Sequence, residues 1–191
     1  MMNKQIISNI EQSRNWAHAG DVEKMSMHLD KVKAEKKDDG FVKLIEIVEK
    51  YGKAIHIHHR LLDDAHERLA KRLNEKEKDQ ALMALKYAKF GLLDMMSKQL
   101  DNARSTVVAD KNLGFIDFIE VTGHKISCYR DLITSIVNVM KNNNQIAAGF
   151  LQSAAEFSKK SSVDVKEDVK MIRKRIIIDG GNENDNSKSY W

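Results

Sequence analysis

The densest group of side chains capable of chemistry lies between positions 56 and 66. The candidate metal ligands in it are His56, His59, Asp63 and His66. Spacings of three, four and three residues place them along one stripe of a helix, but over about 15 Å, so one ion could contact only two of them. The remaining ligands would have to come from another helix, as in twofold metal sites of helical bundles. At an offset of 71 in residue number, the counterparts of Asp63 and His66 are Thr134 and Val137.

We therefore expect no resident metal and no other cofactor, and we interpret the histidines as structural. In this interpretation His58 is a hydrogen-bonded histidine of the core, and the others flank an apolar seam. Two alternatives remain. One is a metal-binding helical bundle centred on the four candidate ligands, and the other is an interface whose clustered histidines become charged near pH 6.

Nucleophilic catalysis has little support in the sequence. Cys128 and His124 are four residues apart on one predicted helix, but no carboxylate or amide is placed to orient the pair. Cys128, the single cysteine, lies in an apolar-periodic stretch that favours a small core residue. Gly180 and Gly181 precede no helix, so the chain has no glycine-rich phosphate loop. We predict no catalytic residues and a protein that is not an enzyme.

Residues near the C-terminus could bind a partner. The candidates are Lys166, Lys170, Arg173, Lys174, Arg175, Tyr190 and Trp191. The basic side chains surround an apolar helical stripe, which suits phosphates, an acidic membrane surface or an acidic protein. Favourable charge at a helix C-terminus would also explain Arg173, Lys174 and Arg175. The aromatic pair ends a polar tail and could dock into a pocket of a partner.

Composition limits the fold and the partners. The 191 residues are 42% hydrophobic, enough for a core, and include no proline to interrupt helices. The net charge of +4 equals that of residues 159–177 alone, which carry seven basic and three acidic side chains. No apolar run is long enough for a transmembrane segment, and the first residues lack a basic-then-apolar signal. We expect a cytoplasmic, all-α protein.

An internal repeat organises the chain. At an offset of 71 in residue number, the segment 16–33 aligns with 87–104 with six identities. At an offset of 74, the segment 40–47 aligns with 114–121 with four identities, and the offset returns to 71 at Gly52 and Gly123. A weaker third start appears at Ala148-Gly149. Each copy predicts two short helices joined at a glycine turn, followed by a long helix.

The expected helices are 3–19, 21–36 and 40–75 in the first copy and 78–90, 92–108 and 114–141 in the second. A last helix is expected to begin at the cap Asp164 and run to about Ile177. The predicted units are a first repeat 1–75, a second repeat 76–143, a partial third unit 144–178 with the basic helix, and a disordered tail 179–191. The seam of the second long helix consists of Phe115, Phe118, Thr122, Ile126, Tyr129, Ile133, Ile136 and Met140.

Each copy resembles a tetratricopeptide hairpin over the aligned segments 16–33 and 87–104, through the turn glycine and the apolar residues five and nine positions beyond it. The chain lacks the terminal proline of that family, and its long helices are not split. The resemblance implies peptide or protein binding on stacked helices.

The fold class that we predict is all-α, with a duplicated helical-hairpin-plus-long-helix unit forming an elongated bundle or short α-solenoid. The predicted function is a non-enzymatic protein–protein interaction module, an adaptor, chaperone or regulator. The alternatives are a nucleic-acid-associated factor that uses the basic C-terminal helix and a metal-binding bundle. The expected partner is another protein. A homo-oligomer is compatible with the long seams, whereas nucleic acid is not favoured, because base-reading side chains and interleaved aromatics are absent.

Overall fold

The computed structural model describes residues 3–36, 38–71, 75–106 and 110–179, and every regular element in these ranges is an α-helix. The helices are α1 (Lys4–Ala19), α2 (Val22–Glu35), α3 (Asp39–Ala70), α4 (Glu75–Phe90), α5 (Leu93–Thr106), α6 (Asp110–Met140), α7 (Asn144–Ser161) and α8 (Lys166–Asp179). The all-α prediction is confirmed. We call α1–α3 the first half of the body and α4–α6 the second half.

Residues with left-handed backbone end several helices, as the sequence predicts. Gly20 and Gly91, which follow α1 and α4, have φ of 74° and 66°. After the first turn, the Asp21 carboxylate accepts a hydrogen bond from the Lys24 backbone N–H at 3.0 Å and caps α2. Asn142, with φ of 59°, follows the end of α6. Gly149 forms no such turn, because it lies inside α7, so the predicted third start is wrong.

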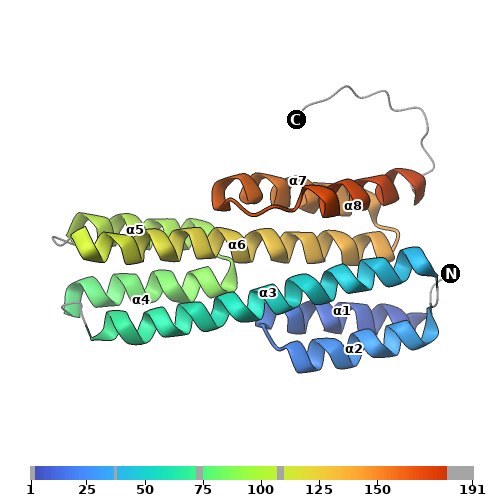
Figure 1. Ribbon diagram of the computed structural model, residues 1–191, viewed down its shortest axis with the longest axis horizontal. Coiled ribbons are helices and arrows are strands. Elements are labelled where there is room, and N and C mark those ends of the chain that lie inside the picture. Colours follow the sequence, from blue (N-terminus) through green and yellow to red (C-terminus); the bar gives the residue numbers. More distant parts are fainter. Residues whose placement is uncertain (1–2, 37, 72–74, 107–109, 180–191) are drawn as a thin grey trace, which may run out of the picture.

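The two long helices α3 and α6 pack against each other and run in opposite directions through an elongated molecule (Figure 1). In that view α1 and α2 lie beside the N-terminal half of α3, and α4 and α5 beside the N-terminal half of α6. The last two helices, α7 and α8, lie along the C-terminal half of α6. The buried side chains form two clusters, and both long helices contribute to each cluster. The long helices therefore join the two ends of the molecule.

Several contacts of the first half recur in the second half at the constant offset of 71. Met25 packs against Gly52, and Met96 packs against Gly123. A Cβ added at either glycine would also lie 3.3 Å from an alanine methyl group, that of Ala17 or Ala88.

Ion pairs between the short and long helices recur in the same way. Lys33 Nζ lies 3.1 Å from Glu49 Oε2, and Arg104 Nη2 lies 2.5 Å from Glu120 Oε2. These pairs keep the offset of 71 through the segment where sequence identity favours 74.

The constant offset corrects the predicted seam of α6. Ile45 and its counterpart Ile116 are both buried, whereas Phe118 of the predicted seam is exposed. The helix begins at Asp110, earlier than predicted, and Asp110 is the counterpart of Asp39, which begins α3. Four identities over eight residues are a weak guide to register in a helix, because a shift of three residues is nearly one turn and keeps much of the apolar pattern.

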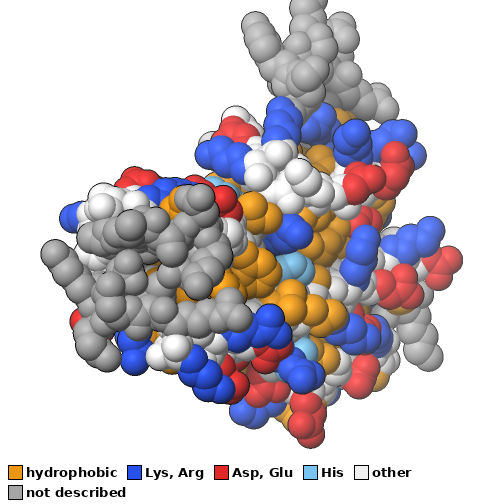
Figure 2. All heavy atoms as spheres, turned by 60° about the vertical axis from the view of Figure 1, so that its left-hand side comes forward, with side chains coloured by type: hydrophobic (Ala, Val, Ile, Leu, Met, Phe, Trp, Pro, Cys, Tyr) orange, Lys and Arg blue, Asp and Glu red, His pale blue; other side chains and the backbone are white. Residues whose placement is uncertain are grey.

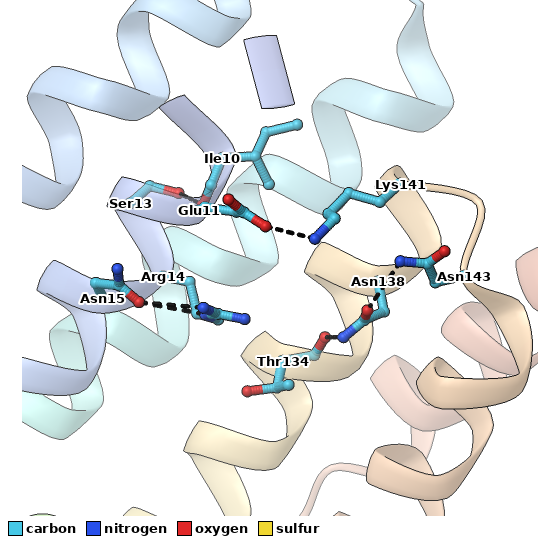
Figure 3. A network of polar contacts seen from close by, with 9 residues as sticks. All are labelled: Ile10, Glu11, Ser13, Arg14, Asn15, Thr134, Asn138, Lys141 and Asn143. Atoms are coloured by element: carbon cyan, nitrogen blue, oxygen red, sulfur yellow. Dashed lines mark hydrogen bonds and ion pairs between the residues drawn. The ribbon is translucent and has the colours of Figure 1, made fainter. Parts of the chain in front are cut away.

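Polar contacts join α1 to the C-terminal end of α6 (Figure 3). Lys141 Nζ donates to Glu11 Oε1 at 2.5 Å, and this hydrogen bond lowers the pKa of the Glu11 carboxyl. On α6, the Asn138 side-chain amide donates to the Thr134 backbone carbonyl at 2.8 Å, one turn earlier. These contacts thus hold α1, the first helix of the first half, against the C-terminal end of α6, the last helix of the second half.

Candidate protein-interaction surface

Two of the three histidines considered as metal ligands hydrogen-bond to helix ends. His56 Nδ1 donates to the Gly20 carbonyl at 2.8 Å, and His59 Nε2 donates to the Lys89 carbonyl at 3.1 Å. His59 is half-buried, and burial lowers its pKa. Since backbone carbonyls only accept, these bonds fix a proton on the ring nitrogens that make them. The two histidines therefore position the ends of α1 and α4 against α3.

A related histidine contact joins the end of α1 to α6. His18, near the end of α1, donates from Nε2 to the Arg130 carbonyl of α6 at 3.2 Å. Arg130 Nη1 in turn donates a hydrogen bond to the His18 carbonyl at 3.4 Å. Burial, with the nearby Arg130 charge as the second cause, lowers the pKa of His18 to about 3. His18 is therefore neutral at physiological pH.

The other two candidate ligands have different surroundings. Asp63 forms an ion pair with Lys89 of α4, and His66 is exposed beside a cavity that Asp79 and Met83 also line. Among the described residues, no three His, Cys, Asp or Glu side chains lie close enough together to hold a metal ion. The structure therefore brings the four predicted residues to one helix stripe but not to one site.

Cys128 is a core residue, as the sequence indicates. Its side chain is fully buried, and Sγ donates to the Ala154 carbonyl of α7 at 3.3 Å. Burial raises the pKa of the Cys128 thiol to about 12, so it carries no thiolate at neutral pH. His124, four residues earlier, stacks on Phe157 with ring centroids 5.9 Å apart. Neither residue is arranged as a nucleophile and its base.

The basic residues of α8 fall into two groups. Lys166, Lys170 and Lys174 are exposed, whereas Arg173 and Arg175 are half-buried. The predicted cap of this helix is present, because Asp164 Oδ1 accepts from the Lys166 backbone N–H at 3.2 Å. The helix extends to Asp179, which the sequence assigned to the tail.

An acidic side chain attaches α8 to the body. Asp168 Oδ2 accepts hydrogen bonds from the Lys50 ammonium at 2.6 Å and from the Tyr51 hydroxyl at 2.5 Å, both on α3. Tyr51 is buried, and its ring stacks on Tyr129 of α6. The predicted binding residues Tyr190 and Trp191 lie outside the described residues, so their predicted role stays a prediction.

The surface that sequence reasoning missed is a groove between α3 and α6. It has a volume of about 200 Å³. Its lining residues are Leu61, Asp64, Ala65, Arg68, Phe115 and Phe118. Ile57 of α3, one turn before Leu61, and Val121 of α6, one turn after Phe118, are also exposed. We call this surface the α3–α6 groove.

A sequence signal for the groove existed. Ile57 and Leu61 are four residues apart, and neither belongs to the apolar seam that the spacing predicts for α3. That seam consists of Phe41, Leu44, Val48, Tyr51, Ile55, His58, Leu62, Ala65 and Leu69. Apolar residues outside the seam of an otherwise amphipathic helix indicate a second contact face. Phe118 was not predicted to be exposed, because the offset of 74 assigned it to the buried seam of α6.

Exposed apolar side chains also occur outside the groove. Phe90, Leu92 and Met95 surround the turn between α4 and α5. A space-filling view shows apolar side chains gathered in the middle of one face, with lysine, arginine and acidic side chains around them (Figure 2). Contiguous exposed apolar surface commonly marks a binding site. The exposed apolar residues at the α4–α5 turn can therefore serve as control positions for substitutions in the groove.

Comparison with protein-family models, curated proteins and solved structures found no match for the chain. No tetratricopeptide model matches, so the hairpin resemblance is limited to the two short aligned segments. Among the described helices, none is long and apolar enough to cross a membrane. A function is consequently inferred from the surface itself.

Proposed function

We propose that this protein is a non-enzymatic helical interaction module that binds another protein in the α3–α6 groove. The groove lies between two halves that we interpret as copies of one unit of two short helices and a long helix. The observation that carries the proposal is the exposure of Leu61 and Phe118 in this groove, with Ile57 and Val121 exposed one turn away on the same two helices.

The repeated contacts support the duplication. The methionine–glycine contacts of Met25 with Gly52 and Met96 with Gly123 are specific pairs of residue types at the same offset. The ion pairs Lys33–Glu49 and Arg104–Glu120 add a second kind of contact. Duplication of a helical unit builds a shape with a surface between the copies, and it does not by itself supply reactive groups.

The chemistry of the groove suits a protein partner. Four of its lining side chains, Leu61, Ala65, Phe115 and Phe118, are apolar, and the exposed Asp64 and Arg68 add charged groups. Protein interfaces have this composition, with a desolvated apolar centre and a polar rim. Its small volume and shallow form suit a surface contact better than an enclosed small-molecule site, which typically has about 300–1,000 Å³.

The test is partner capture with matched surface variants. Affinity-tagged wild type, Leu61→Asp and Phe90→Asp are expressed in the native host, and the captured proteins are quantified by mass spectrometry. Both substitutions place a charge on an exposed apolar position of a helix, so they control for each other. We expect a stoichiometric partner with wild type and Phe90→Asp and its loss with Leu61→Asp. A partner that Leu61→Asp still captures, or no stoichiometric protein at all, would overturn the proposal.

A further inference from the structure

The groove corresponds to a surface that is covered elsewhere in the same molecule. The exposed face of α3 has its counterpart, at the offset of 71, in a face of α6 that packs against α7. Ile57 is 55% exposed and Leu61 41% exposed, whereas their counterparts Cys128 and Leu132 are both 0% exposed. The long helices thus present similar faces, one of which is covered by a helix of the chain.

The same difference holds on the opposite wall. Phe118 of α6 is 36% exposed, and its counterpart Ile47 of α3 is 8% exposed. Ile47 belongs to the buried cluster that includes Val165 and Ile172 from the α8 region. Both walls of the groove are therefore uncovered at positions whose counterparts are buried. Among the described helices, none takes the place over α3 that α7 takes over α6.

The contact of α7 with α6 shows what kind of helix packs on a face of this composition. Ala147, Leu151 and Ala154 of α7 are buried, with spacings of four and three residues. The small alanines let the backbones approach, so that Ser135 Oγ donates to the Ala147 carbonyl at 2.8 Å. At the edge, Ser153 Oγ donates to Asp131 Oδ2 at 2.5 Å. The helix α7, which covers this face of α6, is thus amphipathic and contacts α6 through a narrow stripe of small and apolar residues.

The charges of the groove differ from those of the covered face. Arg60 stands where α6 has Asp131, and Arg68 stands where it has Val139. Asp64 replaces Ser135, so this face of α3 carries two arginines and one acid among these three positions. All three side chains are exposed. A helix that fits here needs acidic side chains on its flank, because opposite charges across an interface favour the correct partner and register.

The helices of the chain that could serve in a second copy have the wrong charge. Helix α7 carries Glu156, Lys159 and Lys160, and α8 carries five basic and three acidic residues. In the register that α7 has on α6, a second copy would place the neutral Ser153 opposite Arg60 and no acidic side chain opposite Arg68, and α8 carries a net positive charge. Charge therefore favours a different protein as the occupant.

We infer that the α3–α6 groove binds an amphipathic helix of a partner protein, which packs on α3 as α7 packs on α6 and has an acidic side chain facing Arg60. This inference rests on the proposed function and specifies its partner class. The helix carries small and apolar residues at spacings of four and three, like Ala147, Leu151 and Ala154.

The test uses a synthetic peptide with the sequence of residues 144–161 and the changes Ser153→Glu, Lys159→Glu and Lys160→Glu. The first change places an acid opposite Arg60 in the α7-like register, and the others remove positive charge. Binding to the full chain is followed by NMR chemical-shift changes, which detect weak complexes. We expect saturable binding with shifts at Ile57, Leu61 and Phe118, its loss with Leu61→Asp, and unchanged binding with Phe90→Asp.

Charge reversal tests the acidic flank. Arg60→Glu should weaken the acidic peptide about three- to tenfold. A second peptide with Ser153→Lys should bind Arg60→Glu better than it binds the wild type. Arg60 is exposed, and circular dichroism checks that each variant keeps its helical content. Equal binding of both peptides to both proteins, or no binding of either, would overturn the inference.

Two outcomes separate this inference from the proposed function. If neither peptide binds but a native partner is captured and lost with Leu61→Asp, the module stands and the partner is not an acidic helix. If sedimentation shows a dimer that Leu61→Asp dissociates, a second copy fills the groove and the inference is wrong.

Discussion

The space around each helical glycine predicts how replacement by alanine changes the stability of the protein. Met25 approaches Gly52 closely, so the effect there should be opposite to the effect at glycines with open surroundings. A Cβ added at Gly52 would overlap Met25 Sδ, and at Gly123 it would overlap Met96 Sδ. Both methionines are fully buried, so they cannot swing into solvent. At Gly114 in α6 and Gly149 in α7, an added Cβ would have nothing within 4 Å. Gly→Ala should therefore destabilise at the first two positions and stabilise at the last two.

The magnitude follows from two terms. Replacing glycine by alanine in a helix stabilises it by about 0.5–1 kcal/mol, through backbone entropy. An extra methyl in a packed core costs about 1–3 kcal/mol. Gly52→Ala and Gly123→Ala should each lower the free energy of unfolding by up to about 2.5 kcal/mol. Gly114→Ala and Gly149→Ala should raise it by up to about 1 kcal/mol. For a protein of this size, 1 kcal/mol corresponds to about 2–4 °C in Tm.

Urea unfolding followed by far-UV circular dichroism measures these changes. A double-mutant cycle with Met25→Ala identifies the cause, since the new methyl at position 52 would occupy space that the shorter side chain vacates. Met25→Ala alone should cost about 2–5 kcal/mol. The double variant should be less destabilised than the sum by about 0.5–3 kcal/mol. Stabilisation by Gly52→Ala, or strict additivity with Met25→Ala, would refute the packing argument.

Three further predictions concern protonation, the attachment of α8 and helix capping. Because the folded protein holds His18 neutral, with a pKa of about 3, its contribution to stability is complete above about pH 6.5 and is lost as the pH falls toward 3. His18→Gln should flatten urea-measured stability over that range, where the wild type loses up to ~5 kcal/mol from this group. Tyr51→Phe removes a hydrogen bond to the Asp168 carboxylate and should cost about 1–2 kcal/mol, with faster hydrogen exchange in α8; unchanged exchange there would contradict the anchoring role. Leu92→Asp should stabilise by about 0.5–1 kcal/mol, because it places a carboxylate cap on α5 as Asp21 does on α2, and a lower Tm would show that the site cannot accept one.

Local signals in the sequence predicted much of the architecture. Turn glycines, absent prolines and apolar periodicity located the described helices to within about five residues, except α7, which was not among the expected helices. The seam of α3 was correct over its length, and Cys128 was correctly expected in the core. The glycine turns at Gly20 and Gly91 have the expected left-handed backbone.

The candidate site was less predictable because it depends on contacts between distant segments. Histidine spacing on one helix cannot show that His59 reaches the Lys89 carbonyl, 30 residues away. The exposure of Leu61 likewise depends on where α7 docks, since the similar residue Leu132 lies under that helix. Similar local sequences thus have different exposure, and only the tertiary arrangement distinguishes them.

The contacts of His18 with Arg130 and of His59 with Lys89 are reciprocal. Positions 18 and 89 differ by 71, as do positions 59 and 130, so each hairpin end meets the long helix of the opposite half. Such an exchange of equivalent contacts is the pattern of an isologous dimer with a twofold axis. The two halves of the body thus exchange matching contacts, and α7 and α8 pack on the side of α6 alone. Among the described residues this groove occurs on one side of the body, so the interaction proposed above would place one partner helix on each chain.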